Sequence, residues 1–186
     1  MKPRRLRIRL LAVSVATLAL LAAAAPLAAQ TASAPALKAA FVYNFAKFTE
    51  WPADVAKTGP LTICVLGDLQ IASELDGTVK GRTIDGREVV VSRAQSDGLR
   101  ACHVLYLSGL DAKRWQQIID ALKNAPVLTV SDAEHFAEAG GIAGLFVDDG
   151  KMRFAINVEA AKRARLQISS RLLSLAKLVE DEHVHP

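Results

Sequence analysis

The sequence lacks the residue patterns on which most enzymes build a catalytic site. The best nucleophile candidate, Ser108 in YLSGL, is not preceded by the glycine that a G-x-S-x-G elbow requires. There is no Walker A sequence, and the turn at Gly67-Asp68 has one glycine where a dinucleotide-binding loop has three. We therefore expect no catalytic residue, no cofactor and no enzymatic activity.

Clusters of metal ligands are also missing from the sequence. Of the four histidines, two stand among the last four residues, and His103 and His135 have no further ligands at the spacing of a zinc site. The segment Asp148-Asp149-Gly150 lacks the later oxygen ligands of a calcium loop. The sequence therefore predicts no metal site.

Acidic residues are absent from the first 29 positions, which carry five of the 23 lysines and arginines. This basic start is followed by an apolar run to Ala25 and by small residues, a pattern that predicts a secretory signal peptide over residues 1–29, cleaved after Ala29. A retained N-terminal membrane anchor is the alternative, because a tilted helix of this length could span a bilayer.

The positive charge of the chain belongs to this N-terminal segment. Removing residues 1–29 leaves 18 basic and 19 acidic residues, a formal charge of −1, so we expect no nucleic-acid partner. The remaining chain is long enough for one domain with its own core. We predict a flexible mature N-terminus at residues 30–35, a single domain at 36–181 and a disordered tail at 182–186.

Cysteine is scarce, with only Cys64 and Cys102 in the chain. Two cysteines in a protein that is exported to an oxidising compartment usually pair, so we expect a disulfide. Two buried free thiols are the alternative.

Short apolar runs alternate with helical patterns along the middle of the chain. The runs predict strands at residues 61–66, 88–92, 103–107 and 127–130, and Asp149-Gly150 predicts the turn of a hairpin. This order is typical of a single α/β domain with a central, mostly parallel sheet of about six strands, helices on both faces, and a C-terminal hairpin plus helix.

Three further helices follow from spacing and capping signals. The first precedes Trp51-Pro52 and carries a stripe that we interpret as core, with Asn44 bonded to a neighbouring backbone group: Leu37, Ala40, Phe41, Asn44, Phe45 and Phe48. Asp111 is the expected N-cap of a second helix. Ser131 and Glu134 form a capping-box pattern that predicts a third, short helix ending at Gly140.

The last predicted helix begins at the N-cap Asn157. Its expected stripe consists of Ile168, Leu172, Leu175, Ala176 and Val179. Alternatively, Ser169-Ser170 caps a second helix, which would place a break near residues 165–167.

Five segments in a fixed order carry a resemblance to a known family. They are KAAFVYNFAKFTEWP, LTICVLGD, CHVLYLS, VLTVSD with GGIAGLF, and RFAINVEAAKRARLQISSRLLSLAKLV. Over nearly the whole mature chain the sequence resembles the family of the periplasmic regulator YfiR. The residues that match its structural motif are Phe41, Asn44, Phe45, Phe48, Trp51, Pro52, Phe154, Leu172 and Leu173.

The resemblance implies an exported α/β domain that represses a membrane-bound diguanylate cyclase by binding its periplasmic sensor region. Repression would lower cyclic di-GMP and biofilm formation. In the family's tripartite form a peptidoglycan-binding outer-membrane lipoprotein sequesters the repressor, and we also expect a homodimer.

Matched to the family, Cys64 and Cys102 occupy the disulfide positions, but a second cysteine pair that some relatives carry near the final hairpin is missing. Relatives often have glycine where this chain has Arg165.

The candidate contacts of this partner cluster in sequence around the last strand and helix. They are Arg153, Asn157, Gln167, Ser169 and Arg171. Helix capping is the alternative role of Asn157 and Ser169, and an exposed or surface-paired charge is that of Arg153 and Arg171.

The alternative function is a periplasmic small-molecule sensor acting with another signalling partner. Its ligand would bind at the carboxyl ends of the parallel strands, near Gly67-Asp68 and Ser131-Asp132.

Overall fold

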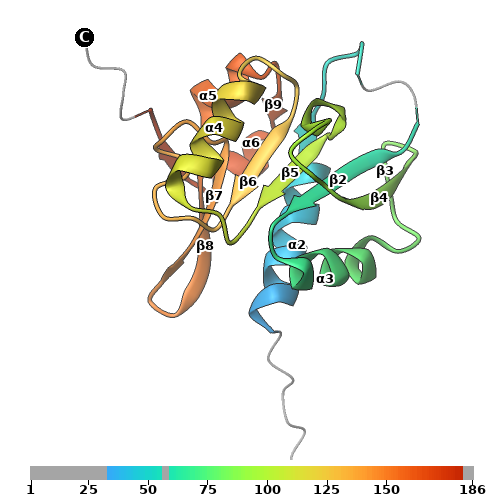
Figure 1. The fold of residues 1–186 in the computed structure, drawn as a ribbon, viewed down its shortest axis with the longest axis horizontal. Helices are drawn as coiled ribbons and strands as arrows, with labels where there is room; N and C mark the ends of the chain where they lie inside the picture. The colour runs from blue at the N-terminus through green and yellow to red at the C-terminus, as the bar shows by residue number, and fades with distance from the viewer. Residues whose placement is uncertain (1–32, 56–58, 182–186) are drawn as a thin grey trace, which may run out of the picture. The chain divides into compact units, whose positions relative to one another are not determined.

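The computed structural model describes residues 33–55 and 59–181 (Figure 1). The predicted signal peptide at residues 1–29, half of the 30–35 segment and the predicted tail at 182–186 lie outside the described residues.

The centre of the domain is one mixed sheet of eight strands. In chain order the strands are β2 (Leu61–Leu66), β3 (Thr83–Ile84), β4 (Arg87–Arg93), β5 (Val104–Leu107), β6 (Leu128–Ser131), β7 (Ala143–Asp148), β8 (Lys151–Asn157) and β10 (Lys177–Val179). Their spatial order is β10-β8-β7-β6-β5-β2-β4-β3, in which β4, β2, β5, β6 and β7 run parallel and β8 runs antiparallel to β7. The predicted single α/β domain with a mostly parallel sheet is confirmed.

Helices cover both faces of this sheet. They are α2 (Ala34–Lys47), α3 (Leu69–Val79), α4 (Ala112–Leu122), α5 (Val158–Arg163) and α6 (Ser170–Leu173), with a 3-10 turn η2 (Leu99–Ala101). Residues of one strand alternate between two cores: Val104 and Tyr106 of β5 join the core under α2, α3 and α5, and Leu105 joins the core under α4. Burial on both faces explains why the strands are continuous apolar runs in the sequence.

The predicted disulfide between Cys64 and Cys102 is present, with a Cα–Cα distance of 5.8 Å. It links Cys64 in β2 to Cys102, which lies two positions before the neighbouring strand β5. Both cysteines are buried in the core under α4.

The sheet has two more strands than predicted, and they lie at its two edges. β3 has two residues and β10 has three, which is too short for a period-2 pattern to appear. The hairpin β7–β8 around Asp149-Gly150 is confirmed.

The predicted continuous last helix is wrong, and the alternative break is confirmed. α5 ends at Arg163, and Arg165 has a φ of +56°, a left-handed conformation that no α-helix residue can adopt. The chain then forms β9 (Gln167–Ile168), α6 and β10 in place of one helix. As a result Leu175, expected in the core stripe, is 72% exposed.

The short helix predicted before Gly140 is also wrong, because residues 134–140 form turns. Ser131 lies inside β6, where its hydroxyl donates to the Leu107 carbonyl (2.7 Å) and accepts from Ala133 N (3.0 Å). The chain then turns so tightly over Gly141 that a Cβ there would lie 2.2 Å from the Phe136 ring. Ser131, the expected cap of this helix, therefore belongs to the sheet.

The left-handed conformation of Arg165 leads to the first prediction. Replacing Arg165 by valine should lower the free energy of unfolding by about 1–2 kcal/mol, because a β-branched side chain is strained at positive φ. Arg165→Gly should leave stability unchanged or higher, since the ion pair that either change removes, with Asp54 at 3.2 Å, is exposed on both sides and contributes little. Urea unfolding of both variants measures this, and equal losses would contradict a left-handed Arg165.

Candidate protein interaction surface

Helix α2 turns one side toward the sheet and leaves part of its predicted apolar stripe near the surface. Its buried residues are Ala39, Val42, Tyr43, Phe45 and Ala46. Phe41 and Phe48 are half-buried and Asn44 is exposed, contrary to the expectation that Asn44 lies within the core. The helix ends at Lys47, before the predicted Trp51-Pro52 stop, and the Asn44 carbonyl accepts from Phe48 N (3.0 Å).

Three phenylalanine rings pack α2 against the β7–β8 hairpin. The Phe154 ring of β8 lies 5.1 Å from the Phe45 ring and 5.8 Å from the Phe41 ring, measured between centroids, and the rings are tilted relative to one another. Tilted aromatic pairs at this distance stabilise a contact beyond the area they bury. The C-terminal end of α2 is therefore fixed relative to the sheet.

The end of α2 meets the segment after α5 in a small second sheet. β1 (Thr49–Glu50) pairs antiparallel with β9, with Glu50 opposite Gln167. One residue further, Ser169 N donates to the Phe48 carbonyl (3.0 Å). These contacts join residues 44–50 and 167–171, and we call their solvent-facing side the junction surface: Asn44, Lys47, Phe48, Glu50, Gln167, Ser169, Ser170 and Arg171.

Phe48 is the aromatic centre of the junction surface. The Arg171 guanidinium and the Lys47 ammonium each lie 5.8 Å from the centroid of its ring. Both cations are exposed, and Phe48 is half-buried. A half-buried aromatic ring flanked by arginine and lysine combines an apolar contact with charged groups that remain available to a partner.

The five predicted contact residues fall in three separate places. Gln167, Ser169 and Arg171 come together on the junction surface, where Ser169 also caps α6 by accepting from Leu172 N (3.3 Å). Arg153 is the third residue of β8, close to the Asp149-Gly150 turn, and pairs with Asp148 at 2.9 Å. The turn of this hairpin lies at the end of the domain away from β9 and α6 (Figure 1). Asn157 is fully buried.

Asn157 has a structural role inside the domain. Its side-chain oxygen accepts from Ala160 N (2.8 Å), which caps α5, and its amide donates to the Ala137 carbonyl (2.9 Å). An effect of Asn157 on partner binding would therefore have to be indirect.

Sequence reasoning missed Lys47 and Glu50 as members of the surface. Lys47 is the last residue of α2, and Glu50 belongs to β1, a strand of two residues whose partner lies more than a hundred positions later. The KAAFVYNFAKFTEWP segment predicts a helix with an aromatic stripe, but no local pattern in it predicts the pairing with β9.

The carboxyl ends of the parallel strands, expected to hold a small molecule in the alternative function, are occupied by interactions within the protein. A Cβ at Gly67 would lie 1.8 Å from the Ser108 carbonyl oxygen, so Gly67 allows two turns to touch. Asp68 caps α3, and Asp132 forms an ion pair with Lys38. These residues have structural reasons for their identity.

The hydroxyl of Tyr106 in β5 differs from these groups. Tyr106 is fully buried, and its hydroxyl has no hydrogen-bond partner within the described residues. Burial first, and then the nearby Asp132 carboxylate, raise the pKa of Tyr106, so its hydroxyl stays protonated.

The buried ring of His103 lies against Trp51, with centroids 5.9 Å apart. Its Nδ1 accepts from Thr62 N (3.2 Å), and an Arg87 nitrogen lies 2.8 Å from Nε2. Burial first, and then the positive charge of Arg87, lower the pKa of His103, although the Val55 backbone acts in the opposite direction. Protonated His103 would set two cations side by side.

Residues 33–55 and 59–181 contain neither a metal-binding cluster nor a membrane-spanning helix. In that part of the chain no group of three or more histidine, cysteine, aspartate and glutamate residues is placed to hold a metal ion. None of the helices described there has the length and apolar character needed to cross a membrane.

Comparison with known proteins identifies the family of the chain. The family model described as YfiR/HmsC-like (DUF4154) matches residues 35–177. The chain belongs to the YfiR/HmsC-like family. This is a family of periplasmic, non-catalytic regulators of cyclic di-GMP signalling. Among solved structures, the chain is similar to an ABC domain in complex with L-Trp from Streptococcus pneumonia, with a TM-score of 0.49 and 11% identity, over 78% of this chain and 62% of that one.

The buried histidine of this YfiR/HmsC-like domain gives the second prediction. Because the folded-state pKa of His103 lies below the ordinary value of 6.5, its contribution to stability is complete above pH 6.5 and is lost as the pH falls toward the lowered folded value. The variant His103→Asn, which keeps an acceptor near Nδ1, should flatten the fall in stability between about pH 6.5 and pH 5.

Thermal unfolding across this pH range measures the effect. The control is His135→Asn, because His135 is exposed and asparagine also tolerates its φ of +55°. An unchanged pH slope in His103→Asn, or an equal change in the control, would contradict the assignment.

Proposed function

We propose that this YfiR/HmsC-like protein is a non-enzymatic periplasmic repressor that binds the periplasmic sensor region of a membrane-bound diguanylate cyclase. Binding lowers cyclic di-GMP and restrains biofilm formation. The observation that carries the proposal is the junction surface, where the exposed cations of Lys47 and Arg171 both lie near the ring of half-buried Phe48.

The junction surface has the features of a protein-binding surface. Its centre is aromatic and its rim is polar, which is the usual arrangement of interfaces. Its two segments are held by the β1–β9 pairing and by the phenylalanine cluster under α2, so little conformational entropy is lost when a partner binds. Arginine and aromatic residues are also the types that most often dominate binding energy.

Repression requires more than affinity. A bound protein shifts the equilibrium of a sensor only by its preference for one of the sensor's conformations. A fixed surface that combines Phe48, Glu50 and Arg171 can supply such a preference, because its side chains match only one arrangement of partner groups. The cyclase would be held in the conformation that fits this surface.

The proposed location of the protein is the periplasm. A cleaved signal peptide over residues 1–29 would deliver the protein to the periplasm, where the Cys64–Cys102 disulfide is stable. The second partner that we propose is a peptidoglycan-binding outer-membrane lipoprotein, which would act by sequestering the repressor. We also propose that the repressor itself forms a homodimer. Arg153, on the hairpin, is a proposed further contact.

The third prediction tests the junction surface. The variant Arg171→Glu should weaken binding to the periplasmic region of a membrane diguanylate cyclase from the same organism by at least about tenfold, or roughly 1.4 kcal/mol. The reversed charge removes the cation beside Phe48. Co-purification and titration of the full chain with that region measure the affinity.

A matched control makes the same charge reversal elsewhere. Lys113 is an exposed residue of α4, which covers the other face of the sheet, and Lys113→Glu should bind like the wild type. In cells, Arg171→Glu should raise cyclic di-GMP and Lys113→Glu should not. If the wild type forms no complex and its deletion leaves cyclic di-GMP unchanged, the proposed function is wrong.

A further inference from the structure

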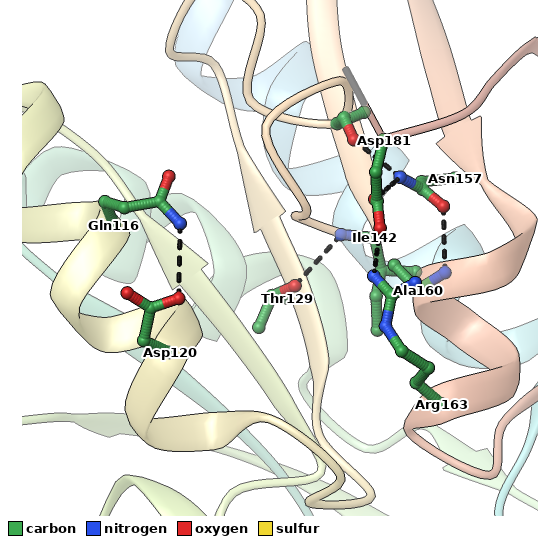
Figure 2. A network of polar contacts seen from close by, with 9 residues as sticks. Gln116, Asp120, Thr129, Ile142, Asn157, Ala160, Arg163 and Asp181 are labelled. Carbon is green, nitrogen blue, oxygen red and sulfur yellow. Dashed lines mark hydrogen bonds and ion pairs between the residues drawn. The ribbon is translucent and has the colours of Figure 1, made fainter. Parts of the chain in front are cut away.

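A cavity of about 420 Å³ opens beside β6, and residues of both α4 and α5 line it. Its apolar lining includes Ile119, Val127 and Ile142, and α4 adds Gln116 and Asp120, which are joined by a hydrogen bond of 3.4 Å (Figure 2). This volume lies within the range of small-molecule sites. The cavity lies near the amino end of β6, away from the carboxyl-edge residues considered above.

A carboxylate already sits in the lining of this cavity, and it comes from the chain itself. Asn157 donates from Nδ2 to one oxygen of Asp181 (2.6 Å), and Arg163 pairs with the other oxygen (2.8 Å). The Asp181 side chain is only 14% exposed. Figure 2 shows the Asn157 amide and the Arg163 guanidinium converging on Asp181.

Asn157, one of the two groups that hold this carboxylate, is positioned by other bonds as well. Asn157 is fully buried, and its bonds to Ala160 N and the Ala137 carbonyl fix the orientation of its amide. Thr129 accepts from Ile142 N (3.0 Å), which fixes the floor of the cavity beside it. An amide donor that is already oriented binds a carboxylate at little cost in conformational entropy, and Arg163 adds a charge-assisted bond.

Asp181, in contrast, belongs to a lightly held segment. It follows β10, an edge strand of three residues that pairs with β8 alone. Leu178 in this strand is 58% exposed, so the strand buries little apolar surface. The occupant of the donor pair is therefore easier to move than the donors.

We propose that Asn157 and Arg163 form a carboxylate-binding site, which Asp181 occupies as an internal substitute, and that a small organic acid with an apolar body displaces Asp181 and fills the cavity. The acid group would take the two bonds now made by Asp181, and its apolar body would cover Ile119 and Ile142. Displacement would release β10 from its C-terminal attachment. This proposal does not depend on the proposed repressor function.

The test uses 3-phenylpropionate as the probe and its uncharged amide as the reference ligand, with calorimetric titration of the full chain. Removing the internal competitor in Asp181→Ala should tighten binding of the acid by about tenfold or more, because a tethered carboxylate has a high effective concentration. The amide should bind neither protein measurably.

Two second-site variants in the Asp181→Ala background identify the donors. Arg163→Gln should abolish the gained affinity. Lys162→Gln is the matched control, because it removes a neighbouring positive charge whose partner is Glu159, outside the cavity lining, and it should leave the gain intact. In the wild type, saturating acid should speed amide hydrogen exchange in Lys177–Val179.

A purely structural Asp181 gives different results. In that case Asp181→Ala unfolds more easily but binds the acid no more tightly than the wild type does, which overturns the proposal. Equal binding of acid and amide, or a gain that survives Arg163→Gln, also overturns it.

Discussion

The pairing of β1 with β9 is the contact on which the interaction surface depends. Two residue pairs, Thr49 with Ile168 and Glu50 with Gln167, connect segments that are far apart in the chain. The hydroxyl of Thr49, which is buried, donates to the Phe45 carbonyl (2.8 Å), so the strand continues rigidly from the end of α2. Without this pairing, Arg171 would have no fixed position relative to Phe48.

The pairing in turn requires the chain to leave the helical conformation after α5. Arg165 provides this by adopting a left-handed backbone, which lets residues 167–168 extend beside β1. Glycine is the residue best suited to that conformation, which gives a physical reason for the glycine that the family resemblance leads us to expect there in relatives. Arginine tolerates the position at some cost, and its exposed side chain faces Asp54.

The main sheet could be predicted from the sequence because its strands are long apolar runs and its turns have clear signals. Asp149-Gly150 and the N-caps Asp111 and Asn157 were all identified from local patterns. The failures share one cause, which is that short elements take their form from distant partners. β1, β9 and β10 have two or three residues each, and Asn44 could not be assigned to the outer side of α2 before the direction of the sheet was known. The sequence predicts Gln167 and Arg171 as candidate contacts. It does not predict Lys47 and Glu50, because no local pattern shows that their segment meets residues 167–171.

The central claim is that a partner binds the junction surface, and hydrogen–deuterium exchange with the sensor region of the cyclase tests it most directly. The account predicts slower exchange in residues 44–50 and 167–171 when the sensor region is added. The backbone of α4, on the opposite face of the sheet, should exchange at an unchanged rate. Protection confined to α4, with both junction segments unaffected, would contradict the account.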